Sequence, residues 1–135
     1  PDRPVVAIVG DGGFQMTIQE LGTISQYNLP VKVILLNNHY LGMVRQWQEL
    51  FFERRYASTG LTNPDFCKMA EAMGIPSRRL TDVDEAENVM KEFAECDGSM
   101  LLHAVIEQEE NVFPMVPAGK SLDNVLENFD EGGNA

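Results

Sequence analysis

The sequence contains few cysteines, few basic residues and no long apolar run. Two cysteines, Cys67 and Cys96, are too few for a disulfide framework and lack metal-binding spacing, so we expect buried, reduced thiols. Ten Lys and Arg against 21 Asp and Glu give a formal net charge of −11 at pH 7. That charge argues against binding to nucleic acid, which needs a basic surface. No apolar run approaches the ~20 residues of a membrane-spanning helix.

Apolar segments of strand and helix type alternate along the 135 residues. This order predicts one α/β domain, with a parallel sheet and helices on both of its faces. The expected strands are Val5–Val9, Val31–Leu36, Ser77–Leu80 and Met100–Ile106. The expected helices are Phe14–Gln26, Met43–Phe52, Asp65–Met73, one from Asp82 or Asp84 to Ala94, and a short one over Ser121–Phe129. We expect Gly132–Ala135 to be disordered.

Helical spacing predicts which side chains share a face. Met43, Val44, Trp47, Leu50 and Phe51 fall on one side of a helix, which periodicity alone reads as core more often than as a substrate pocket. The corresponding apolar stripe of the last long helix is Val83, Ala86, Met90 and Phe93. Asn63-Pro64 has the pattern of a helix N-cap and first-turn proline. Glu53–Thr62 is polar and contains a glycine, which predicts a mobile loop.

Polar residues follow each of the first two expected strands. Gly10-Asp11-Gly12 ends the first strand and Asn37-Asn38 ends the second. In a parallel sheet both groups lie at the same edge, where α/β proteins bind ligands. Asp11 with Asn37 or Asn38 supplies hard oxygen ligands of the kind that Mg²⁺ prefers, and glycines admit a close ligand. We therefore expect a diphosphate bridged by Mg²⁺, although Asp11 is also suited to capping a helix and the Asn pair to forming a turn.

The spacing of these two groups resembles the signature of thiamine diphosphate enzymes, because 24 residues, from Gly13 to Leu36, separate Gly-Asp-Gly from Asn-Asn. Within that family, the flanking sequence resembles the catalytic subunits of acetolactate synthases. The segments that carry this resemblance are Gly10–Thr17, Asn37–Asn38, Leu41–Gln48 (LGMVRQWQ), Asn63–Phe66 (NPDF), Ala70–Gly74 and Pro114–Pro117.

The resemblance implies thiamine diphosphate and Mg²⁺ as cofactors, with FAD bound in the parent enzyme mainly by another domain. It implies that Asp11, Asn38 and the backbone carbonyl of Tyr40 bind the metal. The implied cofactor-binding residues are Gly10, Asp11, Gly12, Gly13, Met16, Asn38, Gly42 and Met43. Met43, Val44 and Trp47 would then face the 2-keto acid substrate, with Trp47 selecting the acceptor by size. His39 and His103 are expected to be structural.

The resemblance also implies that this chain is roughly the last fifth to quarter of a longer subunit. Residues 1–114 would form the diphosphate- and Mg-binding part, and residues 115–135 a flexible tail. The parent reaction would decarboxylate pyruvate and join the two-carbon unit to pyruvate or 2-oxobutyrate. The glutamate that activates the cofactor belongs to a separate domain of a neighbouring subunit, so we expect no catalytic residue in this chain and no activity from it alone.

The expected partners are 2-keto acids, identical subunits joined through the other domains, and a regulatory small subunit; neither nucleic acid nor a membrane is expected. The expected compartment is the bacterial cytoplasm, or a plastid or mitochondrion in a eukaryote. Two other interpretations are a domain of a different thiamine diphosphate decarboxylase or carboligase and a non-catalytic fragment.

Overall fold

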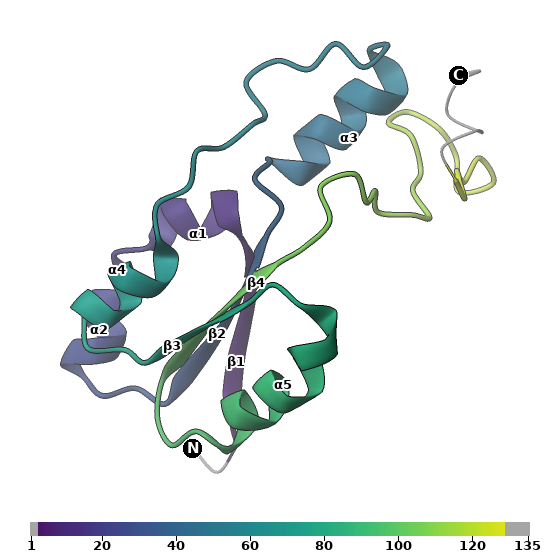
Figure 1. Cartoon of the computed structure of the whole chain (residues 1–135). Helices are drawn as coiled ribbons and strands as arrows, with labels where there is room; N and C mark the ends of the chain where they lie inside the picture. Colours follow the sequence, from purple (N-terminus) through teal and green to yellow (C-terminus); the bar gives the residue numbers. More distant parts are fainter. Residues whose placement is uncertain (1–2, 129–135) are drawn as a thin grey trace. The chain divides into compact units, whose positions relative to one another are not determined.

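A computed structural model describes residues 3–128 of the chain. Its sheet has four parallel strands in the order β1-β2-β4-β3 (Figure 1). The strands are β1 (Val5–Gly10), β2 (Val31–Asn37), β3 (Ser77–Leu80) and β4 (Met100–Val105). The helices are α1 (Asp11–Thr17), α2 (Glu20–Gln26), α3 (Gly42–Phe51), α4 (Phe66–Ala72) and α5 (Ala86–Glu95), with the 3₁₀ turn η1 (Val83–Glu85) before α5. The predicted parallel α/β fold is confirmed.

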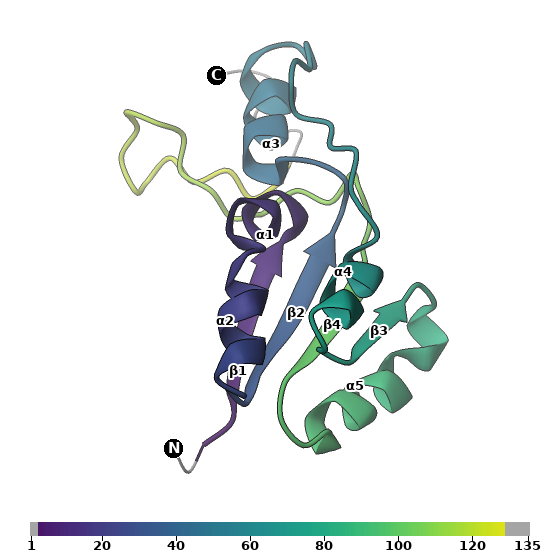
Figure 2. The same cartoon turned by 90° about the vertical axis from the view of Figure 1, so that its left-hand side faces the viewer.

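Alternate residues of the strands pack against different helices, because successive side chains point to opposite faces of a sheet. Val33, Leu35 and Leu101 lie in a core with residues from α1, α2 and α4. On the other face, Met100 and Leu102 pack with Val89 and Phe93 of α5. Figure 2 shows α1 and α2 in front of β1, with β2 beside them. Helices therefore cover both faces, as the sequence predicts.

The chain forms two compact units. The first comprises Pro1–His39 and Thr62–Glu107, and holds the sheet with α1, α2, α4 and α5. The second comprises Tyr40–Leu61 and Gln108–Ala135, and holds α3. The expected functional division at residue 114 remains a prediction. No helix within residues 3–128 is both long enough and apolar enough to cross a membrane.

One predicted helix, Phe14–Gln26, is wrong as a single element. The structure has α1 and α2 instead, joined by turns in which Leu21 N donates to Ile18 O and Gly22 N to Gln19 O. Thr17 Oγ1 bonds back to Gly13 O at 3.2 Å. Such side-chain bonds bend or end helices, and β-branched residues such as Thr17 and Ile18 have reduced helix propensity.

Two further expectations need correction. The apolar stripe predicted for the last long helix is wrong at Val83 and Met90, which are exposed. The buried apolar residues of this helix, α5, are Val89 and Phe93. Val83 belongs to η1, which is capped by the Asp82 side chain, so the helical count starts later than expected. In the described part of the helix predicted over Ser121–Phe129, the structure has turns and an antiparallel bridge that pairs Met115 with Leu126. Phe129 and Gly132–Ala135 lie outside the described residues.

Candidate functional site

Asp11 lies where β1 ends and α1 begins, and its residue surface is 1% exposed. Its Oδ2 accepts a hydrogen bond of 2.6 Å from Nδ2 of Asn63. No ion pair among residues 3–128 involves Asp11. A buried carboxylate without a countercharge is costly, and a bound cation offsets that cost.

Asn37, the last residue of β2, is buried within a set of internal hydrogen bonds. Its Oδ1 accepts from the backbone N–H of His39 at 3.0 Å and from Asn63 Nδ2 at 2.8 Å. Its Nδ2 lies 2.9 Å from His103 Nε2. Both ends of the Asn37 amide therefore face protein groups. Asn38, the next residue along the chain, is half-buried.

His103 on β4 completes this set from inside the sheet. Because Asn37 presents its NH₂ group, His103 Nε2 accepts and the ring proton sits on Nδ1, which has no hydrogen-bond partner among the described residues. Burial lowers the pKa of His103, and the charge of Arg79 lowers it further. The ring also packs edge-on against Phe66 at 5.5 Å. These contacts describe a neutral histidine inside the fold.

Asn63 has a different role from the one that the sequence suggests. The N-cap of α4 is Asp65, whose side chain accepts from Lys68 N, so the prediction of Asn63 as the cap is wrong. Asn63 instead donates to both Asp11 and Asn37 and accepts from Gln15 Nε2 at 2.6 Å. The local Asn-Pro pattern fits a cap equally well, and these contacts span 26 to 52 residues of sequence. The sequence around Asn63 therefore carries no local signal of these contacts.

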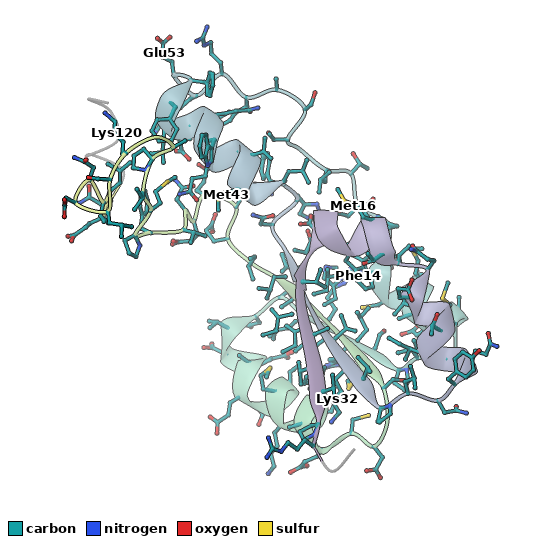
Figure 3. The ribbon with its side chains drawn as sticks, turned by 180° about the vertical axis from the view of Figure 1, so that it is seen from behind. Phe14, Met16, Lys32, Met43, Glu53 and Lys120 are labelled. Carbon is teal, nitrogen blue, oxygen red and sulfur yellow. The ribbon has the colours of Figure 1, made fainter. Side chains whose placement is uncertain are left out.

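The predicted glycines and Met16 surround Asp11 in the sequence. Gly12 is buried and Gly13 is exposed. A Cβ added to Gly10 would meet no atom within 4 Å, so there is open space beside the strand end. Met16 is 72% exposed, while Phe14 of the same helix turns into the core (Figure 3). Met16 is thus available for contact with a ligand and is not part of the described core.

The remaining predicted residues belong to the second unit, which the chain enters at Tyr40. Tyr40 pairs with Gly60 in an antiparallel bridge, and Leu41 N donates to Thr59 O at 2.8 Å. Gln48 also exchanges two hydrogen bonds with the backbone of Ala57. The segment expected to be a mobile loop is thus hydrogen-bonded to α3 and to the residue before it, Leu41. The mobility of this segment remains a prediction.

The buried face of α3 is mostly polar, which corrects the expected apolar side. Arg45, Gln46, Glu49 and Leu50 are buried, whereas Met43 and Val44 are about half exposed. The side chain of Gln46 both donates to and accepts from the backbone of Val112 at 2.9 Å. Polar backbone from residues 108–117 thus meets this face, and polar side chains satisfy it.

Arg45 is the centre of these contacts. Its guanidinium bonds Glu49 at 3.2 Å and both carboxylate oxygens of Glu109 at 2.7 Å. It also lies 5.0 Å from the ring centre of Tyr40 and 4.7 Å from that of Tyr56. Burial acts to lower the pKa of Arg45, but the bond to Glu109 and the surrounding negative groups raise it overall. Arg45 is therefore a fixed charge that holds two segments to α3.

Trp47, two residues further along α3, is half-buried. It packs edge-on against Phe51 at 5.4 Å between ring centres. Trp47, Phe51, Pro117, Ala118 and Lys120 line a cavity of about 180 Å³. A cavity of this size with an aromatic wall suits a small apolar group better than a whole cofactor.

The oxygen donors near Asp11 fit one particular type of Mg²⁺ site, in which the protein supplies only a few of the ligands. Within residues 3–128, no group of three or more His, Cys, Asp or Glu residues is placed to hold a metal ion. One carboxylate with amide oxygens matches Mg²⁺ sites in which phosphate and water supply the other ligands. The residues present therefore fit a cation that arrives with a phosphate-bearing cofactor.

Comparisons with known proteins give the same class of ligand. Residues 1–104 match the family model described as thiamine pyrophosphate enzyme, C-terminal TPP binding domain. The chain is 49% identical over 128 residues to the acetolactate synthase isozyme 2 large subunit of Escherichia coli, covering 94% of this chain and 23% of that protein. It is 44% identical over 130 residues to the mitochondrial acetolactate synthase catalytic subunit of Saccharomyces cerevisiae, covering 96% of this chain and 19% of that protein.

Solved structures agree on the fold. A thiamine diphosphate-dependent 4-hydroxybenzoylformate decarboxylase from Rhodococcus jostii superposes with a TM-score of 0.74 at 25% identity, over 82% of this chain and 21% of that one. A benzoylformate decarboxylase from Polynucleobacter necessarius gives the same TM-score at 26% identity, over 83% of this chain and 21% of that one. The chain thus spans about a fifth of the length of these relatives. It belongs to the family of thiamine pyrophosphate enzymes, as their C-terminal TPP-binding domain.

Proposed function

We propose that this chain is the diphosphate- and Mg²⁺-binding part of an acetolactate synthase catalytic subunit. The observation that carries the proposal is Asp11, buried without a countercharge at the carboxyl end of β1 and held by an amide. The similarity at 42–49% identity to acetolactate synthases supports this assignment over the decarboxylases at 25–26%.

In this proposal Asp11 and Asn38 supply side-chain oxygens to Mg²⁺ and Tyr40 a backbone carbonyl. The open space beside Gly10 and the exposed Met16 leave room for the cofactor. Thiamine diphosphate, when bound, supplies the chemistry that splits a 2-keto acid and transfers its two-carbon unit. The chain itself holds and orients that cofactor. Met43, Val44 and Trp47 of α3 form the apolar wall that the acceptor 2-keto acid meets.

The rest of the parent enzyme belongs to the same proposal. FAD, identical subunits and a regulatory small subunit would be bound mainly outside this chain, in the bacterial cytoplasm or in a plastid or mitochondrion. We expect the isolated 135-residue chain to form no acetolactate from pyruvate. Product formation at the rate of a complete synthase would show that the assignment of catalysis to other domains is wrong.

Calorimetric titration of the chain with thiamine diphosphate and Mg²⁺ tests the binding site. We expect Mg-dependent binding in the natural chain, and loss of it in Asp11→Ala and Asn38→Ala. Asn88→Ala is the matched control, because Asn88 is an exposed asparagine on α5. Equal binding by all four proteins would mean that the metal site lies elsewhere.

A second candidate is another thiamine diphosphate decarboxylase, favoured only by the structural similarity to the two benzoylformate-type enzymes. The two candidates differ in the acceptor. A synthase joins two 2-keto acids, whereas a decarboxylase releases an aldehyde. Analysis of the products that the complete parent enzyme forms from pyruvate distinguishes them.

A further inference from the structure

The charge of Asp11 sets the direction of a chain of hydrogen bonds that runs into the sheet. An ionised carboxylate only accepts, so Asn63 must turn its NH₂ group toward Asp11. Its oxygen then faces Gln15, which must donate. The second Asn63 hydrogen meets the oxygen of Asn37, and Asn37 in turn points its own NH₂ at His103. Each of the side-chain amides of Gln15, Asn37 and Asn63 therefore has one permitted orientation.

We propose that Asn63 is a positioning residue for the metal ion: it fixes the Asp11 carboxylate while Gln15 and Asn37 fix Asn63. Its amide lies 2.6 Å from Asp11, 2.8 Å from Asn37 and 2.6 Å from Gln15, and its Nδ2 also lies 3.4 Å from Nδ1 of His39. Since Asn63 engages only Oδ2 of Asp11, the other carboxylate oxygen is left for a cation. This inference rests on the proposed function, because it takes Asp11 as the ligand.

A fixed carboxylate has a consequence for the choice of ion. Mg²⁺ and Mn²⁺ need short bonds in near-octahedral geometry, whereas Ca²⁺ accepts longer bonds and variable geometry. A carboxylate held in one orientation therefore favours the smaller ions. Releasing it weakens binding of the smaller ions most and narrows the preference over Ca²⁺.

The contact itself is tested first, without any cofactor. In NMR spectra of the 135-residue chain, the Asn63 NH₂ protons should exchange slowly with water. Their chemical shifts should change in Asp11→Ala. The exposed Asn88 amide is the internal reference. Exchange of the Asn63 protons as fast as those of Asn88 would overturn the inference, whatever the fate of the proposed function.

The second test measures Mn²⁺ binding by electron paramagnetic resonance in the presence of thiamine diphosphate, with Ca²⁺ as competitor. Asn63→Ala should weaken Mn²⁺ binding by about 10- to 100-fold, the usual effect of removing a hydrogen-bond partner of a ligand. It should weaken Ca²⁺ binding less. Asn88→Ala should change neither affinity. Failure of the natural chain to bind Mn²⁺, or equal binding by Asp11→Ala, would overturn the proposed function and this inference with it.

A double-mutant cycle separates positioning from general loss of structure. Gln15→Ala should weaken Mn²⁺ binding in the natural chain, and should have no further effect once Asn63 is alanine. Melting temperatures of all variants are measured alongside. An unchanged ratio of Mn²⁺ to Ca²⁺ affinity in Asn63→Ala, or additive effects of the two substitutions, would reject positioning even where Asp11 is confirmed as a ligand.

Discussion

In the first unit the buried Asp11 carboxylate accepts a hydrogen bond from an amide, whereas in the second unit Arg45 is buried between two carboxylates and two aromatic rings. Both are charged groups removed from water. The charge of Arg45 is balanced within the unit, by Glu49 and Glu109. The charge of Asp11 is not balanced by any ion pair in the described residues. The contrast separates a charged group that holds segments together from one that, in our proposal, binds a metal ion.

The surfaces of the two units differ in a related way. In the first unit, apolar side chains of the central strands β2 and β4 are buried under helices. In the second unit, α3 buries polar groups and leaves Met43 and Val44 half exposed. An apolar helix face that its own unit does not cover is available to a ligand. The polar inner face of α3 thus complements the proposal of an apolar outer wall for substrate.

The largest effect is expected from breaking the balanced charge. Arg45→Ala leaves Glu49 buried without its main partner, and removing one member of a buried pair costs about 3–5 kcal/mol. We expect the amides of Leu41 and Val112 to exchange much faster, measured by hydrogen exchange with mass spectrometry. Arg54→Ala is the matched control, because the exposed Arg54 lies 3.5 Å from the same Glu49 and surface pairs contribute about 0–1 kcal/mol. Similar effects of both substitutions would contradict the central role of Arg45.

The next effect concerns the outer face of α3. Trp47→Leu in the complete enzyme should reduce its preference for 2-oxobutyrate over pyruvate as acceptor, by about 1–3 kcal/mol, because one apolar wall discriminates one methylene. The melting temperature should change little. Product ratio and melting temperature are measured on the same variant. A large loss of stability with an unchanged product ratio would assign Trp47 to the core.

Removing the unbalanced charge should have the opposite sign. Asp11→Asn keeps the shape and one acceptor oxygen for Asn63 while it removes the buried charge. Without divalent cations we expect the variant to be more stable than the natural chain by about 1–2 kcal/mol, at the scale of uncompensated buried groups. Urea unfolding in EDTA measures this. A clear loss of stability there would mean that the charge is compensated in the free protein.

The smallest effect is a dependence on pH. Burial lowers the pKa of His103, so the unfolded chain binds more protons than the folded one below the ordinary value of 6.5. Stability from this group is complete above that pH and is lost as the pH falls through and below it. His103→Gln keeps an acceptor for Asn37 and should reduce the fall of melting temperature as the pH drops below about 6.5. Equal slopes in both proteins would refute the assignment.

Much of the first unit could be predicted from the sequence, because its signals are local. Apolar residues recur at the spacing of strands and helices, and glycines or asparagines follow the ends of β1 and β2. The predicted strands at Val5–Val9 and Val31–Leu36 each gained one residue in the structure. The role of Asn63 could not be predicted, since its partners Gln15, Asp11 and Asn37 are distant in sequence. For α3, periodicity shows which residues share a face but not which face points inward. Here the polar face points inward, because it meets the polar backbone around Val112.

Strand β1 forms one edge of the described sheet, and Val5, Val6 and Ile8 on it are exposed. An edge strand with uncovered valine and isoleucine is a template for pairing with another chain. The formal net charge of −11 opposes such contact between copies by mutual repulsion. Salt screens this repulsion, so concentrated solutions of the chain should self-associate more as ionic strength rises, and lysine in place of Ile8 should suppress that association.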